Sequence, residues 1–311
     1  MNNGNAVGVE FGNAICYSGY RRNQSPVTGA YPTYDEIRED LRILDPNWRY
    51  LRLYDSGPHA ETVLAAIHRE KLDLRVMLGA DMRAELNNPK CPWGAKFSRK
   101  QLAANRRANE EEIDRLIDLA GRFPEIVFSV SLGNEATVEW SDHLIPVKRV
   151  VGFARIVRKA VAQPVTFCEN YVPWTEKLEP LVAEIDFISV HTYPVWENRT
   201  IEDALDFTIE NYRSVADRYP EKQVVIAEAG WTTNSNGRGI EPENVSEEFQ
   251  AEYFGQLSRW SEEHEILTFV FEAFDEPWKG YPDPMEPEKH WGLFTVDRKP
   301  KLVMSKLYAH L

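Results

Sequence analysis

The chain has 311 residues, which is enough for either one large barrel domain or two ordinary domains. It carries 36 Lys and Arg against 49 Asp and Glu, and this net charge of −13 disfavours binding to nucleic acid or to an anionic membrane. No apolar run approaches the roughly 18 residues of a membrane span, and the first residues lack the basic and apolar segments of a signal peptide. We therefore leave the localisation open: cytoplasmic on its face, and periplasmic or secreted if a leader was removed.

Eight short apolar runs recur along the chain. They are rich in Val, Ile, Phe and Leu, as is typical of parallel strands that are buried on both faces. In chain order we predict strands over residues 6–11, 50–55, 74–80, 126–133, 164–169, 187–193, 224–229 and 268–275.

Helical patterns lie between these runs. Apolar residues at Ile37, Leu41 and Leu44 predict one helix, and a similar repeat over residues 201–215 predicts another. Capping-box patterns, in which a Ser or Thr precedes an acidic residue or Gln by three positions, predict helix starts at residues 33–36, 98–101 and 200–203.

Alternation of strands and helices indicates parallel strands with right-handed crossovers. Eight such units favour a closed (β/α)₈ TIM barrel, an α/β fold, over an open doubly wound sheet. No glycine-rich phosphate-binding motif follows any predicted strand, which removes the usual signature of the open sheet. Since no linker or break in composition is visible, we predict a single catalytic domain over residues 1–311.

Two glutamates end predicted strands. Glu135 follows the fourth run, after Gly133 and Asn134, and Glu228 ends the seventh. Strands four and seven lie across the ring, so that the two side chains can face each other at the carboxyl end of the barrel, where barrel enzymes hold their active sites. Two facing carboxyl groups suit glycosidic cleavage, in which one is protonated and the other ionised. The alternative for each residue is a solvated loop position or a helix cap.

Five short motifs stand at or just after the ends of predicted strands. They are Arg52-Leu53-Tyr54-Asp55, Gly133-Asn134-Glu135, His191-Thr192-Tyr193-Pro194, Glu228-Ala229-Gly230-Trp231-Thr232 and Glu276-Pro277-Trp278-Lys279. In this order they resemble the motifs of glycoside hydrolase family 17, the β-1,3-glucanases and β-1,3-glucanosyltransferases among the clan A retaining barrels. The resemblance runs from about residue 7 to 303, and is closer to the bacterial and fungal branches than to the plant branch. The sequence departs from the plant pattern at His191 and Asp275, where the plant enzymes have Asn.

The resemblance implies that Glu135 is the general acid/base and Glu228 the nucleophile of a retaining enzyme. We expect it to cleave β-1,3-glucan of the laminarin type through a covalent glycosyl-enzyme. One alternative is a β-1,3-glucanosyltransferase that uses the same intermediate, and another is a non-catalytic carbohydrate-binding barrel. Carboxylates suffice for this chemistry, so no cofactor is implied. The three cysteines have no metal-ligand spacing, and we expect no metal site.

Polar and aromatic residues near the strand ends are candidates for sugar binding. Seven of the nine tryptophans follow predicted strands; we expect three or four of them only to pack loops, and Trp231 and Trp278 to contact sugar. Packing is also the alternative for the tyrosines, and a structural imidazole is the alternative for His191. Glu276 and Lys279, three positions apart, can form an ion pair. The full set is Asn134, Tyr54, Tyr193, His191, Trp231, Glu276, Trp278 and Lys279. The partner we expect is a β-glucan polysaccharide or oligosaccharide, with no nucleic acid and no membrane, and the protein itself a monomer.

Overall fold

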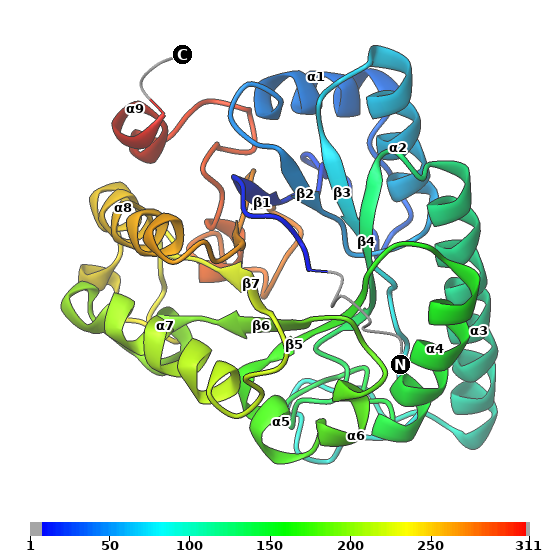
Figure 1. Ribbon diagram of the computed structural model, residues 1–311. Coiled ribbons are helices and arrows are strands. Elements are labelled where there is room, and N and C mark those ends of the chain that lie inside the picture. The colour runs from blue at the N-terminus through cyan, green and yellow to red at the C-terminus, as the bar shows by residue number, and fades with distance from the viewer. Residues whose placement is uncertain (1–7, 309–311) are drawn as a thin grey trace.

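The computed structural model describes residues 8–308, which form a closed ring of eight parallel strands surrounded by helices (Figure 1). The first strand pairs with both the second and the eighth, and this closes the ring. The predicted (β/α)₈ barrel is thereby confirmed. The strands are β1 (Ala14–Cys16), β2 (Tyr50–Arg52), β3 (Arg75–Leu78), β4 (Val127–Asn134), β5 (Val165–Asn170), β6 (Ile188–Thr192), β7 (Val224–Ala229) and β8 (Thr268–Val270).

The helices follow the strands in alternation, and β5 is followed by two short ones. They are α1 (Tyr34–Leu44), α2 (Pro58–Glu70), α3 (Arg99–Arg122), α4 (Val147–Ala160), α5 (Tyr171–Glu176), α6 (Glu179–Val182), α7 (Ile201–Ala216), α8 (Glu247–Glu263) and α9 (Leu302–Leu307). Short 3₁₀ helices interrupt three loops: η1 (Pro194–Glu197), η2 (Pro242–Asn244) and η3 (Pro287–Lys289).

Local sequence signals account for the helix starts. Thr33 and Ser98 both form the predicted capping boxes, with Glu36 and Gln101 respectively, at the beginning of α1 and α3. Thr200 is the N-cap of α7, but its side chain makes no capping hydrogen bond, so the third predicted box is wrong in this detail. The apolar face of α1 is buried against the barrel as its periodicity predicts.

The first strand lies later in the chain than the sequence pattern suggests. Within residues 8–11 no strand forms, and residues 6 and 7 lie outside the described part of the chain. The backbone of Val9 instead exchanges hydrogen bonds with the Gln223 side chain, at 2.8 and 2.9 Å, while Glu10 is exposed. The barrel uses Ala14–Cys16, a three-residue segment that is fully buried but too short to stand out in a hydropathy pattern.

The last strand is shorter than predicted. After Val270 only single hydrogen bonds join the chain to its neighbours, from Phe271 N to Ala229 O and from Ala273 N to Cys16 O. The same segment pairs with a later loop: Glu272 N donates to Trp291 O, and Leu293 N donates to Glu272 O at 2.9 Å. Residues 271–301 therefore form a long closing loop beside the carboxyl end of the barrel. Loops that follow strands, such as 79–98, 135–146 and 230–246, are longer than those that precede them, and so supply most of the surface at this end.

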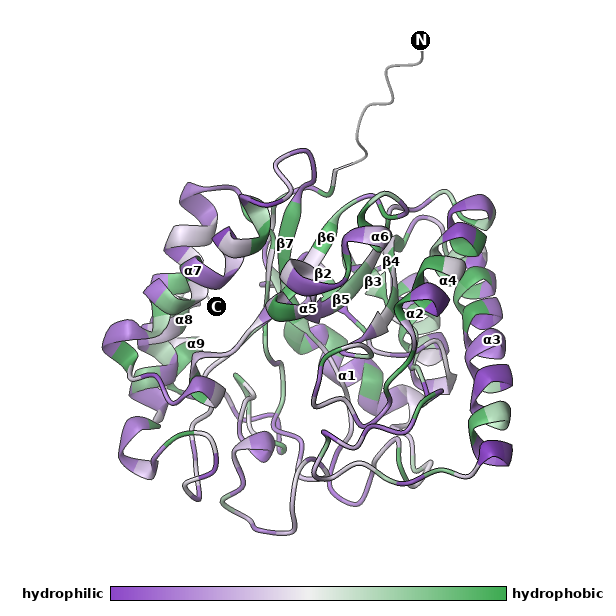
Figure 2. Ribbon diagram, turned by 90° about the horizontal axis from the view of Figure 1, so that it is seen from below, coloured by the Kyte–Doolittle hydropathy of each residue, from purple (hydrophilic) through white to green (hydrophobic). Residues whose placement is uncertain are grey.

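Hydropathy is distributed as the fold requires. In Figure 2 the central strands are coloured mainly as hydrophobic, whereas long outer helices such as α3 carry hydrophilic residues along the side that faces away from the strands. Buried apolar side chains of all the strands and of the inward helix faces form one continuous core. Over residues 8–308 no helix combines the length and the apolar character needed to cross a bilayer.

Candidate active site

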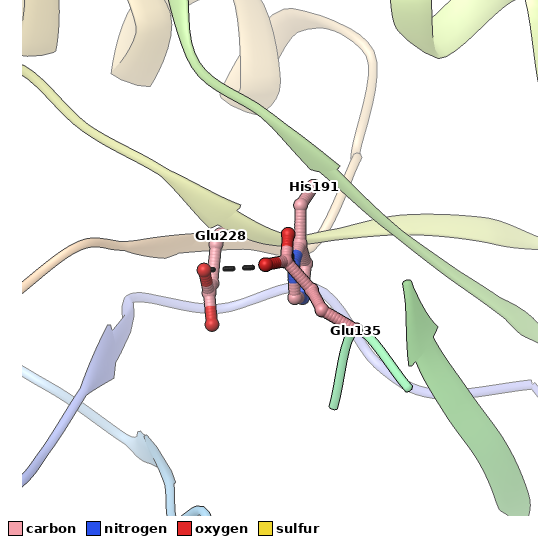
Figure 3. Close-up of side chains that lie close together, drawn as sticks. All are labelled: Glu135, His191 and Glu228. Atoms are coloured by element: carbon pink, nitrogen blue, oxygen red, sulfur yellow. Dashed lines mark hydrogen bonds and ion pairs between the residues drawn. The ribbon is translucent and has the colours of Figure 1, made fainter. Parts of the chain in front are cut away.

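Glu135 and Glu228 lie close together at the carboxyl end of the barrel, with His191 of β6 beside them (Figure 3). The Nδ1 atom of His191 is 3.0 Å from Oε1 of Glu135 and 3.5 Å from Oε2 of Glu228. One oxygen of each carboxyl group lies within 4.8 Å of the other. Sheet pairing brings His191 next to Glu228, because the two residues are ladder partners between β6 and β7.

The backbone that carries Glu135 is irregular. Glu135 has φ of 45°, in the left-handed region that non-glycine residues rarely occupy, and the register between β4 and β5 shifts between Ser131 and Asn134. Gly133 precedes it with φ of 156°, and a Cβ there would lie 3.1 Å from the Phe167 ring. The bulge therefore turns the Glu135 side chain out of the strand direction and toward β7.

Glu228 is held in its ionised form. Its side chain is only 6% exposed, yet Arg52 donates to Oε1 and the Tyr193 hydroxyl donates to Oε2 at 2.5 Å. Burial raises the pKa of Glu228, but the charges of His191 and Arg52 and these hydrogen bonds outweigh that effect and lower it to about 2. The carboxylate is consequently negative over the whole physiological range and faces the cleft.

His191 is charged for the complementary reason. Burial lowers its pKa, but the negative charge of Glu228 and the nearby Cys168 and Glu135 side chains more than offset this and raise the pKa to about 10. Glu135, His191 and Glu228 have the donor types of a metal site. In this structure the same three residues are engaged with one another and with Arg52, which donates to Glu228.

A second charged cluster borders the site beyond β8. The Lys279 ammonium lies 2.7 Å from Glu272 and 2.5 Å from Glu276, and the Trp278 indole donates to Glu276 at 2.9 Å. The Glu272 and Glu276 side chains are fully buried. The predicted ion pair between Glu276 and Lys279 is confirmed, and Glu272, which the sequence places inside a strand, is its third member.

Two adjoining cavities form the cleft. The first, of about 340 Å³, contains both glutamates and is called the Glu228 cavity. The second, of about 620 Å³, contains Glu135 but not Glu228 and is called the Trp140 cavity. They share residues from three loops, so the cleft is continuous. The shared wall consists of Glu135, Tyr193, Trp196, Trp278, Lys279 and Glu288.

The structure brings most of the predicted binding residues to the Glu228 cavity. Tyr54 lies against the Arg52 guanidinium, whose central carbon is 4.6 Å from the ring centroid, and Asn134 accepts from the same guanidinium at 2.5 Å. Both residues therefore contact the cleft and also support Glu228 through Arg52. The predicted residues that line this cavity are Tyr54, Asn134, Tyr193, Glu276, Trp278 and Lys279.

Two predicted sugar contacts are wrong. Trp231 is fully buried, packs against Tyr253 of α8 with ring centroids 5.6 Å apart, and lines neither cavity. Its indole turns away from the cleft because the loop after β7 leaves the barrel toward α8. His191 is also fully buried and lines neither cavity; it contacts the two glutamates rather than the space that a sugar would occupy.

The seven tryptophans that follow predicted strands fall into two groups, four that line the cleft and three that are buried. Four line the Trp140 cavity, and two of these are widely open to solvent, with Trp93 51% and Trp140 38% exposed. The other three of the seven are fully buried, although Trp291 also forms part of the wall of the Glu228 cavity. The four in the cleft are Trp93, Trp140, Trp196 and Trp278.

The sequence did not reveal the roles of Arg52 or of the pair His143 and Asp142. Arg52 carries the charge that faces Glu228, and the signal was present: an arginine in an apolar strand needs a buried acidic partner. His143 and Asp142 lie in the loop after β4 and line the Trp140 cavity next to Glu135. No spacing in the sequence indicates that His143 contacts the backbone of Asn134, because that contact depends on the path of the loop.

Known proteins resemble this chain over most of its length. Residues 14–292 match the sequence profile of the BtgE/BtgC glycoside hydrolase domain. A putative glucan endo-1,3-beta-glucosidase btgC from Aspergillus niger is 25% identical over 303 residues, which cover 89% of this chain and 41% of the relative. A glucan 1,3-beta-glucosidase from Arthroderma benhamiae is 31% identical over 131 residues, 38% of this chain and 41% of the relative. The chain thus spans about two fifths of the length of the curated relatives it matches.

Solved structures show the same barrel. An endo-laminarinase from Formosa superposes with a TM-score of 0.81 at 27% identity, covering 96% of this chain and 86% of that one. A family 17 β-1,3-glucanosyltransferase from Rhizomucor miehei, at 22% identity and a TM-score of 0.72, covers 93% and 95% and shares the fold. Together with the sequence matches, these structures confirm the resemblance to family 17. Because the matching profile extends from β1 to the loop that closes the barrel, the chain belongs to the BtgE/BtgC glycoside hydrolase family.

Proposed function

We propose that the protein is a retaining glycoside hydrolase that cleaves β-1,3-glucan, with Glu135 as general acid/base and Glu228 as nucleophile. The observation that carries this proposal is the short separation of the two carboxyl groups, with oxygens within 4.8 Å. Retaining glycosidases place these groups about 5–5.5 Å apart, whereas inverting enzymes need about 6.5–9.5 Å to admit a water molecule between carboxylate and sugar.

The first half of the reaction uses both glutamates at once. A Glu228 oxygen attacks the anomeric carbon as the glycosidic C–O bond breaks, and Glu135 gives its proton to the departing sugar oxygen. The low pKa of Glu228 keeps the attacking group ionised. Arg52 and Tyr193, which hold its two oxygens, orient the carboxylate. The products are a glycosyl ester on Glu228 and a free sugar that carries the new hydroxyl group.

In the second half, a water oxygen attacks the anomeric carbon and the ester bond breaks. Glu135, now ionised, accepts the water proton, and Glu228 returns as a carboxylate. A sugar hydroxyl can take the place of the water, which would make the enzyme a glucanosyltransferase. The Trp140 cavity favours this second candidate, because it adjoins Glu135 on the side away from Glu228 and presents four indoles to an acceptor sugar.

Support for the substrate comes from the relatives. The Aspergillus niger relative is a putative glucan endo-1,3-beta-glucosidase, and the Formosa protein is an endo-laminarinase. The net charge of −13 is compatible with a neutral polymer. We also propose that residues 1–311 act as one catalytic domain and as a monomer, which size-exclusion chromatography with light scattering would test.

The decisive experiment is product analysis on linear β-1,3-gluco-oligosaccharides. Proton NMR in the first minutes should show the β-anomer, and chromatography should show shorter chains for hydrolysis or chains longer than the substrate for transfer. An initial α-anomer would contradict retention. Faster cleavage of cellulose- or xylan-type β-1,4 chains than of laminarin would contradict the substrate and leave the two-glutamate mechanism in place.

A further inference from the structure

The peptide group that joins Asn134 to Glu135 is held at both of its edges. The Glu135 amide donates to the Cys168 carbonyl of β5 at 3.0 Å, and the Asn134 carbonyl lies 2.7 Å from Nε2 of His143. This peptide precedes a residue with φ of 45°, a conformation that the surroundings must impose. Its orientation sets the direction in which the Glu135 side chain leaves the backbone.

The two ring nitrogens of His143 both face acceptors. Nε2 faces the Asn134 carbonyl, and Nδ1 lies 2.6 Å from an Asp142 carboxylate oxygen. A neutral imidazole has only one N–H, so both hydrogen bonds are made only by the imidazolium. With one proton removed, a nitrogen lone pair would point at either the carbonyl or the carboxylate, and one of the two contacts would become repulsive.

The charges around His143 support the protonated form. Burial lowers its pKa, but the hydrogen bonds to Asp142 and to the Asn134 carbonyl, together with the negative charges of Asp142 and Asp81, raise it to about 9. The same hydrogen bond lowers the pKa of Asp142. Asp142 belongs to the loop of His143, and Asp81 to the loop after β3. The other charged residues along the wall of the Trp140 cavity are Glu135, Glu197, Arg238, Lys279 and Glu288.

The loop that carries His143 is itself anchored. Ile145 N donates to Ala136 O at 2.8 Å, and this bond closes the loop across its base. From the loop after β3, the Asn88 amide donates to the carbonyls of Glu139 and Ser141 at 2.7 and 2.8 Å. His143 is therefore a fixed support for the Asn134 carbonyl, braced from a separate segment of the chain.

We propose that His143, kept as an imidazolium by Asp142, is a positioning residue that fixes the Asn134–Glu135 peptide and thereby aims the Glu135 carboxyl group at the glycosidic oxygen. The inference rests on the proposed role of Glu135. It predicts that loss of His143 weakens proton transfer to the leaving group and leaves attack by Glu228 intact.

Leaving groups of different basicity separate this role from a general structural one. We would measure kcat/KM, which reports the first half-reaction, for laminaritetraose and for 2,4-dinitrophenyl β-laminaribioside. The dinitrophenolate departs without a proton, whereas a sugar alkoxide needs one. His143→Ala should lose about 10²-fold on the tetraose, as for a misplacement of about 1 Å, and less than about 3-fold on the aryl substrate.

Asp142→Asn is the second variant, and it leaves the imidazole in place. It should cause the same leaving-group-dependent loss, growing as the pH rises from about 6 to about 8, because His143 then titrates nearer its ordinary pKa of about 6.5. His68→Ala, an exposed histidine of α2, is the matched control and should match the wild type on both substrates. Thermal unfolding of each variant checks that the proteins compared are folded.

Two results would overturn the inference. Equal losses on both substrates would make His143 a structural residue only, and an unchanged kcat/KM in both His143→Ala and Asp142→Asn would remove any role in the reaction. Glu135→Ala, assayed in parallel, distinguishes this failure from that of the proposed function. If Glu135→Ala itself shows no dependence on the leaving group, then the assignment of Glu135 as general acid is wrong.

Discussion

The Arg52 guanidinium lies against the Glu228 carboxylate, and both side chains are almost completely enclosed, at 2% and 6% exposed. Its Nη1 atom donates to Glu228 and its Nη2 atom to Asn134, so one residue of β2 connects the ends of β7 and β4. The low pKa of Glu228 depends on the charge of His191 and on this contact with Arg52.

Removal of Arg52 should destabilise the folded protein. Arg52→Met leaves a buried carboxylate without its main hydrogen-bond donor, and we expect the free energy of unfolding to fall by about 3–5 kcal/mol. Urea denaturation measures this. Arg22→Met is the control, since its pair with Asp297 is exposed and worth less than about 1 kcal/mol. Equal effects of the two substitutions would contradict the assigned role of Arg52.

Replacement of the proposed nucleophile should abolish turnover. In Glu228→Gln the neutral amide neither attacks the anomeric carbon nor stabilises positive charge there, and we expect kcat to fall at least about 10³-fold on laminari-oligosaccharides. The exposed Glu10, changed in the same way, provides the control for loss of one negative charge. A purified Glu228→Gln protein that keeps a tenth of the wild-type rate would remove Glu228 from this role.

The depressed pKa of Glu228 has a consequence for stability at acid pH. A carboxyl group whose pKa falls from 4.5 to about 2 on folding stabilises the protein fully above about pH 4.5, and this contribution disappears as the pH falls toward 2. The shift corresponds to about 3 kcal/mol. We would measure the free energies of unfolding of the wild type and of Glu228→Gln by denaturation at intervals from pH 6 to pH 2. The two free energies should converge as the pH falls through this range. A difference between the two free energies of unfolding that stays constant with pH would show that the pKa of Glu228 is not lowered.

The Trp140 cavity should govern binding of long chains. Trp140→Ala removes an indole that is 38% exposed in this cavity, and we expect KM for laminarihexaose to rise about 10-fold, equivalent to about 1.4 kcal/mol. KM for a short aryl glycoside should stay the same. Trp231→Phe is the comparison: it should lower the melting temperature without a change in either KM, because Trp231 lies outside both cavities. If Trp140→Ala raises KM for the aryl glycoside as well as for laminarihexaose, Trp140 lies next to the reacting bond instead.

Much of the fold could be predicted because its signals are local. The seventh strand, Val224–Ala229, matches its predicted run at both ends, since a strand buried on both faces needs an unbroken series of apolar residues. The largest departure is β1, where Ala14–Cys16 has three small or branched residues that resemble many other segments. Pairing with β2 and β8 selects this segment, and such pairing is not a local property.

The sequence by itself determined the eightfold barrel, the family, and the approach of Glu135 and Glu228, because strand order in a closed ring places the ends of β4 and β7 at one mouth. Only the tertiary structure decided which way each side chain in the loops points. Trp231 and Trp140 both follow strands, yet one indole packs against α8 and the other faces the cleft. The direction depends on how each loop leaves the barrel. The contact between His143 and the Asn134 carbonyl depends on the same loop geometry, and hydrophobic periodicity carries no information about it.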